Sequence, residues 1–280
     1  MAPPVAPTST TVIRARRGWA GLGLRELAGY HELLYFLVWR DLKVRYKQTA
    51  FGVAWAVLQP LLLMAILTLF LGRMSGIAPA GIPYPLFVLA GLVPWTLFAQ
   101  SVASAGNSLV EGAALLSKVY FPRLIFPLAA TGSHTVDFGI GLVLLLIVST
   151  ISGFGPAPTW LALVPFAALA LLAALAVGLW LAALNVQYRD FRYAIPFLIQ
   201  LWFFATPIAY GAEAVPESLR GFLALNPMTG VVEGFRWALT AGVAGRPDVS
   251  VLVSALATLV ILVGGLAFFR RVERTFADVI

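Results

Sequence analysis

Hydrophobic positions occur along this chain in long uninterrupted blocks, separated by short stretches that contain the charged residues, glycines and prolines. A helix needs about 20 apolar residues to cross roughly 30 Å of hydrocarbon, whereas strands of an outer-membrane barrel are much shorter. The blocks therefore predict six transmembrane helices, over residues 51–71, 84–105, 124–149, 159–184, 194–210 and 249–269. We expect an all-α integral membrane protein with a transmembrane domain over 49–269.

The stretch before the first block, residues 30–48, is amphipathic. In a helical projection one side is apolar and carries Tyr30, Leu33, Leu34, Leu37 and Val44. The opposite side is basic and carries Arg40, Lys43 and Lys47. This pattern predicts a helix that lies along the membrane surface. Asp41 and Arg45 are spaced i, i+4, and we expect them to form a pair.

A mixed segment over 211–248 precedes the last block. Its two apolar stretches, 218–225 and 231–241, are each too short to cross a membrane, and Asn226–Pro227 separates them with turn-forming residues. The pattern favours a re-entrant helical hairpin over 218–241 that enters from the outer face. An amphipathic outer loop is the alternative.

Composition supports the membrane assignment. Hydrophobic residues make up 60% of the 280 positions and charged residues only 11%, against roughly 25% charged in a soluble domain. The absence of cysteine from the chain excludes a disulfide, a thiolate nucleophile and a cysteine-ligated metal. The ridge Ala170, Ala174, Gly178 and Ala182 in the fourth block predicts close helix packing.

The basic residues are distributed as membrane topology requires. Six crossings place both termini on one side, and fifteen of the nineteen lysines and arginines fall on that side. The other side has Arg73, Arg220, Arg236 and Arg246. We therefore expect both termini in the cytoplasm, with a disordered segment over 1–29 and a charged tail over 270–280. A net charge of +7 spread over the inner loops argues against a nucleic-acid surface.

Ionisable side chains within a membrane span are candidates for function. His134 and Asp137 lie on one face of the third block, and on a straight helix from residue 124 the carboxylate is roughly 20 Å along the axis. One interpretation is a proton relay, and the other is a polar pair that is satisfied inside the bundle. No metalloprotease, serine-hydrolase or Walker A motif occurs, and none of the lysines (Lys43, Lys47 and Lys118) follows a glycine. We expect no catalytic, cofactor or metal site in this chain, so that any ATP and Mg²⁺ would be bound by another subunit.

Aromatic and amide side chains recur on several spans. They are Phe51, Trp55 and Gln59 in the first, Trp95 and Phe98 in the second, and Tyr193, Phe197, Gln200 and Phe204 in the fifth. Such faces suit sugar rings, which present apolar CH surfaces with a rim of hydroxyl groups. Ordinary bundle packing is the alternative interpretation of each residue.

Five sequence segments, in order, carry a resemblance to a known family. They are WRDLKVRYKQTAFGVAWAVLQP (39–60), SKVYFPRLIFPLA (117–129), YRDFRY (188–193), LNPMTGVVEGFRWAL (225–239) and VERTFADVI (272–280). With them, residues 30–280 resemble the permease subunit of type-2 ABC exporters, in the branch that moves lipid-linked polysaccharides such as O-antigen, teichoic acid and capsule. The resemblance implies a homodimer in the bacterial inner membrane, bound to two copies of a cytoplasmic ABC ATPase.

The resemblance also implies roles for individual positions. The first ATPase contact maps onto Arg40, Asp41, Lys43, Arg45, Tyr46 and Lys47, and the second onto Asn107, Glu111, Lys118 and Tyr120. The outer helices map onto 225–239, which gives an outer gate of Asn226, Pro227, Glu233 and Arg236. The aromatic positions named above are the expected substrate path, between two subunits.

Three other functions remain open at this point. A type-2 ABC exporter of drugs or lipids would have the same topology. A proton-coupled carrier would use His134 and Asp137. A membrane-embedded enzyme would need a nucleophile that no motif nominates.

Overall fold

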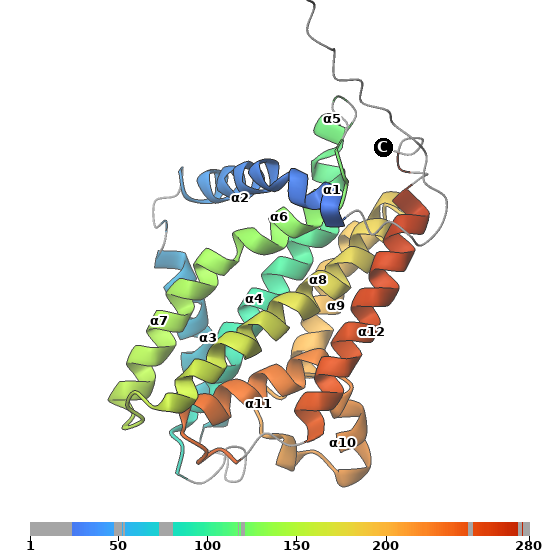
Figure 1. The fold of residues 1–280 in the computed structure, drawn as a ribbon. Helices are drawn as coiled ribbons and strands as arrows, with labels where there is room; N and C mark the ends of the chain where they lie inside the picture. The colour runs from blue at the N-terminus through green and yellow to red at the C-terminus, as the bar shows by residue number, and fades with distance from the viewer. Residues whose placement is uncertain are drawn as a thin grey trace, which may run out of the picture.

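The computed structural model describes residues 24–47, 52, 54–72, 81–116, 118, 121–245, 249–273 and 276, and within these ranges every regular element is a helix (Figure 1). Two helices precede the bundle in sequence, α1 (Leu24–Gly29) and α2 (His31–Tyr46). The bundle and its connections are α3 (Ala54–Leu71), α4 (Tyr84–Glu111), α5 (Ala113–Leu116), α6 (Ile125–Ser133), α7 (Thr135–Ile151), η1 (Pro158–Ala162), α8 (Leu163–Gln187), α9 (Phe191–Phe204), η2 (Ala212–Ala214), α10 (Glu217–Ala224), α11 (Pro227–Leu239) and α12 (Val249–Val272).

Among the described residues, 5 helical segments are long and apolar enough to cross a membrane. They are α3, α4, α6 with α7, η1 with α8, and α12. The remaining predicted span, 194–210, contains α9, which has only 14 residues and ends at Phe204. The chain is therefore a multi-pass membrane protein.

The third predicted span is not one straight helix. It consists of α6 and α7, which meet at His134 and run in different directions (Figure 1). The expected position of Asp137, roughly 20 Å along a single axis, was therefore wrong. The break places Asp137 in the first turn of α7, next to the C-terminal end of α2.

The core is built around α4, which is buried along most of its length between the other helices. The helix that packs most extensively against α4 is α8. The predicted ridge of small residues lies on α8, and all four residues of this ridge are buried. A Cβ on Gly178 would lie 2.7 Å from the Cβ of Ala105, so the two helix backbones approach each other at a distance that only glycine permits. The small-residue ridge is confirmed as a packing surface.

The two ends of the bundle differ. At one end α2 lies across the bundle, together with α5, the α8–α9 connection and the C-terminal end of α12 (Figure 1). At the other end lie α10 and α11 (Figure 1). We call these the α2 end and the α11 end. The predicted surface helix over 30–48 is present as α2, and the outer segment contains two separate helices as expected.

Candidate functional site

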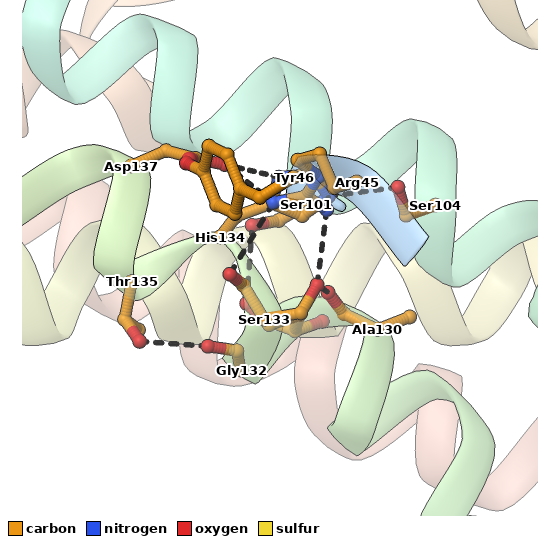
Figure 2. A network of polar contacts seen from close by, with 11 residues as sticks. Arg45, Tyr46, Ser101, Ser104, Ala130, Gly132, Ser133, His134, Thr135 and Asp137 are labelled. Atoms are coloured by element: carbon orange, nitrogen blue, oxygen red, sulfur yellow. Dashed lines mark hydrogen bonds and ion pairs between the residues drawn. The ribbon is translucent and has the colours of Figure 1, made fainter. Parts of the chain in front are cut away.

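A group of polar side chains joins α2 to α4 and to the α6–α7 break at the α2 end (Figure 2). We call it the Asp137 cluster, and it consists of Arg45, Tyr46, Ser104, Ser133, His134 and Asp137. Arg45 and Tyr46 come from the last turn of α2, Ser104 comes from α4, and the other three lie at the α6–α7 break. The cluster therefore connects the surface helix to two helices of the bundle.

Asp137 is at the centre of the cluster. Arg45 donates to one carboxylate oxygen through Nη1, and the Tyr46 hydroxyl donates to the other. Arg45 also donates to Ser133, at 3.2 Å to Oγ and 3.4 Å to the carbonyl oxygen. The side chain of Asp137 is only 13% exposed, so these donors replace the water that a free carboxylate would bind.

His134 extends the cluster to α4. Its Nε2 lies 3.2 Å from Nη2 of Arg45 and 2.8 Å from Oγ of Ser104. Because a guanidinium can only donate, Nε2 must accept, and we assign the neutral tautomer with the proton on Nδ1. Nδ1 lies 3.6 Å from an Asp137 oxygen. A guanidinium thus occupies the nitrogen that a proton relay would need. The pair is only partly satisfied inside the bundle, because Nδ1 is buried without a hydrogen-bond partner among the described residues.

The expected pair between Asp41 and Arg45 does not form. Asp41 instead accepts from its neighbour Arg40, at 3.0 Å from Nε and 2.8 Å from Nη2, and Arg45 turns toward Asp137. Helical spacing identifies partners within one helix, whereas this contact joins positions separated by 92 residues. The one signal in the sequence was a carboxylate within an apolar block, which requires a buried donor.

Two cavities border the cluster. One, of about 150 Å³, lies between α3, α4 and α7, and Trp55, Gln59 and Gln100 line it together with Asp137. The other, of about 370 Å³, lies between α2, α4 and α6. Its wall contains four of the positions predicted to contact an ATPase, namely Arg40, Asp41, Arg45 and Glu111.

The remaining predicted contact positions have different surroundings. Lys43, Lys47 and Lys118 are exposed, and Lys43 lies over the ring of Trp39. Asn107 is turned inward, because it donates to Ala103 of its own helix and accepts from Asn185 of α8 at 3.0 Å. Tyr120 lies outside the described residues.

The predicted substrate-path residues fall into two groups. Those of α9 form an exposed face, with Tyr193 at 80%, Phe197 at 60% and Phe204 at 67% exposure, and Gln200 is exposed among them. Trp55 and Gln59 of α3 are also exposed, and Phe51 lies outside the described residues.

The path residues of α4 are placed differently. Trp95 and Phe98 are buried, and their rings contact Phe203 and Trp202 at centroid distances of 5.7 Å and 5.2 Å. Burial gives these two residues a packing role within the chain. Aromatic periodicity could not separate this role from an exposed one, because both produce the same pattern.

Asn226 joins α9 to α11 at the other end of the bundle. Its Oδ1 accepts from the backbone N–H of Met228 at 3.0 Å, which caps α11, and from the indole of Trp202 at 2.9 Å. Its Nδ2 donates to Ala205 O and Thr206 Oγ1, at 3.1 and 2.9 Å. Pro227 follows as the first residue of α11, a position that suits its missing N–H.

Arg236 is a buried cation at the same end. It donates to the carbonyl oxygens of Ile208 at 2.7 Å and Phe87 at 3.3 Å, and its guanidinium lies 3.5 Å from the centroid of the Phe87 ring. Glu233, one turn earlier in the same helix, acts electrostatically in favour of the charged guanidinium. Glu233 itself accepts from Ser250 of α12 at 2.8 Å. Three of the four predicted gate residues, Asn226, Glu233 and Arg236, are thus bound to neighbouring elements in this structure.

Comparison with known proteins places these features in context. A family model described as ABC-2 type transporter matches residues 32–240. The O-antigen export system permease protein RfbA of Myxococcus xanthus is 35% identical over 218 residues, which cover 76% of this chain and 82% of that protein. The protein of the same name from Klebsiella pneumoniae is 28% identical over 251 residues, covering 89% and 95%. The polysialic acid transport protein KpsM of Escherichia coli is 26% identical over 236 residues, covering 84% and 91%.

Proposed function

The chain belongs to the ABC-2 type transporter family, and we propose that within it this protein is the permease subunit of an ATP-driven exporter of a lipid-linked polysaccharide. The observation that carries the proposal is similarity over most of the chain to permeases named for O-antigen export and to proteins named for polysialic acid transport. The two names specify different glycans. The shared property is therefore export of a polysaccharide rather than recognition of one sugar.

The exposed face of α9 supports a glycan as the cargo. On α9, Tyr193, Phe197 and Phe204 offer rings and Gln200 offers an amide, beside two exposed leucines. The exposed positions of α12 between 249 and 263 are all aliphatic, namely Val249, Leu252, Leu256, Leu259, Val260 and Val263. Aliphatic side chains are suited to lipid, and rings with amides are suited to the CH faces and hydroxyl groups of sugars. We place the path between two copies of the chain, with the α9 face and Trp55 and Gln59 of α3 along it.

A separate ABC ATPase supplies the energy in this proposal. The chain has no Walker A sequence, so ATP and Mg²⁺ are held by the partner, in two copies for a homodimer. The exposed Lys43, Lys47 and Lys118, with the wall of the cavity between α2 and α4, form the surface that the ATPase contacts. The protein itself is a transporter component and not an enzyme.

The orientation follows from the distribution of charge. The α11 end has two described basic residues, Arg220 and Arg236. The described lysines and arginines at the α2 end are Arg25, Arg40, Lys43, Arg45, Lys47, Lys118, Arg123, Arg189, Arg192, Arg270 and Arg271. Positive residues remain in the cytoplasm, so we assign the α2 end and both termini to that side of the inner membrane.

The sixth crossing and the outer hairpin belong to the proposal as well. We count α9 with residues 205–210 as a span, because it leads from the α2 end to the α11 end (Figure 1). We assign α10 and α11 to a re-entrant hairpin. In its support, α11 is buried along most of its length against α4, α8 and α12, which an amphipathic loop on the surface would not achieve.

Deletion of the gene tests the function. We expect loss of one surface polysaccharide and accumulation of its lipid-linked form inside the cell, and both should be reversed by the wild-type gene. Immunoblotting of surface glycan and extraction of lipid-linked oligosaccharide are the measurements. Unchanged surface glycan with altered drug resistance or phospholipid distribution would assign the chain to the drug or lipid exporters instead.

A further inference from the structure

The two halves of α2 are attached to the bundle by different means. Leu37 is 4% exposed and belongs to an apolar cluster with Phe121, Leu124 and Phe269. After Leu37, no described residue of α2 is fully buried, and Val44 is 76% exposed. Apolar packing therefore holds the first half of the helix, and its last two turns are held by polar contacts.

Those polar contacts converge on one carboxylate. Arg45 and Tyr46 are consecutive in sequence, and each donates to a different oxygen of Asp137 (Figure 2). Asp137 lies in the first turn of α7, where the backbone N–H groups favour a negative charge. His134 and Ser104 extend the contact to α4. The carboxylate of Asp137 thus connects the end of α2 to α7, and the contact of Arg45 with His134 extends this connection to Ser104 of α4.

We propose that Asp137 is a positioning residue for transport, which holds the C-terminal end of α2 against α7 so that a displacement of α2 moves the membrane helices. This inference rests on the proposed function, in which an ATPase acts on α2. The covalent chain connects the end of α2 only to α3. Helix α2 packs mainly against α6, and α3 packs against α7. Asp137 adds a direct polar contact between the end of α2 and α7 itself.

Substitution of Asp137 by asparagine tests this connection with little change of shape. The amide oxygen can still accept from Tyr46, whereas Arg45 loses its counter-ion in a place where it is only 30% exposed. A matched control is Glu273→Gln, which neutralises a carboxylate at the same end of the bundle. Glu273 pairs with Arg270 within its own helical turn, at 3.4 Å, and among the described residues its carboxylate joins no other helix.

The first experiment measures the position of α2 without any partner. The chain contains no cysteine, so labels can be placed at Val44→Cys and Ile151→Cys, positions 76% and 80% exposed, with no background. Pulsed electron paramagnetic resonance of the purified full chain in lipid nanodiscs gives the distance distribution. We expect a narrow distance distribution for the labelled protein that keeps Asp137 and for its Glu273→Gln variant. The Asp137→Asn variant should give a broadened distribution. An unchanged distribution in Asp137→Asn would overturn the inference.

The second experiment measures transport in the complex with the cognate ATPase. We expect Asp137→Asn to lower the amount of glycan exported per ATP hydrolysed by about fivefold or more, the lower end of the range for coupling between sites. Yield of the complex and its rate of ATP hydrolysis should stay near the control. Equal export, or a fall in complex yield that accounts for the lost export, would refute the positioning role.

The two experiments separate this inference from the proposed function. If the wild-type complex exports no glycan, the proposed function fails, while the label distances still decide whether Asp137 holds α2. If the wild type exports glycan and Asp137→Asn exports equally, the inference fails and the function stands.

Discussion

Arg236 shows how a single buried charge can hold elements together. Its contacts join α11 to the backbone of α4 through Phe87 and to the residues after α9 through Ile208. Carbonyl oxygens and an aromatic ring replace water around the cation, so each contact is worth more than it would be at the surface. Removal of the guanidinium takes away one donor from each of these two carbonyl groups and leaves a space beside the Phe87 ring.

We therefore expect Arg236→Gln to destabilise the permease by about 2–4 kcal/mol, as loss of a buried, hydrogen-bonded charge does. Arg236→Lys keeps the charge but loses the forked geometry, so its stability should lie between those of the wild type and Arg236→Gln. Thermal unfolding in detergent, followed by intrinsic tryptophan fluorescence, is the measurement. The control is Arg220→Gln, because Arg220 is exposed at the same end and bonds only to nearby carbonyl groups. Equal losses in the two variants would contradict the role given to Arg236.

Asn226 gives a second prediction at this scale. Asn226→Ala removes a helix cap, worth about 1 kcal/mol, together with the bonds to Trp202, Ala205 and Thr206. Asn226→Asp keeps an acceptor for the cap and for the indole but loses both donors. We expect the melting temperature to be highest for the wild type, lower for Asn226→Asp and lowest for Asn226→Ala. An alanine variant as stable as the wild type would show that other contacts hold α9 to α11.

At the scale of elements, the close contact of α4 with α8 depends on one missing side chain. We predict that Gly178→Ala destabilises the bundle by about 1–3 kcal/mol, the cost of overpacking, because its Cβ would lie 2.7 Å from that of Ala105. Gly139→Ala in α7 is the matched control, since nothing lies within 4 Å of its added Cβ, and alanine favours a helix. Melting temperature and yield of folded protein are the readouts. Comparable loss in both variants would show that helix flexibility, rather than the α4–α8 contact, decides stability.

The elements were largely predictable from the sequence, because length and hydropathy of a block determine whether it can cross a membrane. The small-residue ridge of α8 also follows from residue spacing alone. A helix at α2 was predicted too, but Val44 of its predicted apolar side is 76% exposed. Contacts between distant positions were not predictable in this way. The break at His134 directs Asp137 toward Arg45, and no pattern within either segment records that direction.

The same limit applies to the aromatic residues. Trp95 of α4 and Phe197 of α9 have similar sequence surroundings, yet the first is buried against Phe203 and the second is 60% exposed. Which face of a helix meets its neighbours depends on how all the helices pack. A single sequence does not specify that packing through periodicity.

At the scale of the whole molecule, the exposed faces of α9 and α12 predict different neighbours. The exposed face of α9 carries rings and an amide besides Leu198 and Leu201, whereas that of α12 is aliphatic from Val249 to Val263. If two copies enclose a glycan path, α9 faces the second copy and α12 faces lipid. This arrangement gives a prediction that needs no substrate.

A single cysteine at Leu201 of α9 should become cross-linked to a second copy, whereas one at Leu256 of α12 should not. The two positions are 51% and 63% exposed, so each is open to reagent, and the chain offers no other cysteine. Membranes from cells that express each variant are treated with a short bis-maleimide, and the dimer band is measured on a denaturing gel. Because labelling with a monofunctional maleimide reports access separately, a missing band at Leu201→Cys with full labelling would place the α9 face away from the second copy.

Without the cross-linked band, the aromatic face would not lie on a path between subunits, and Phe197→Ala should leave export unchanged. With the band present, Phe197→Ala should reduce export while the dimer and its ATPase contacts remain, because a lost ring removes stacking for the glycan and no contact within the chain's own core.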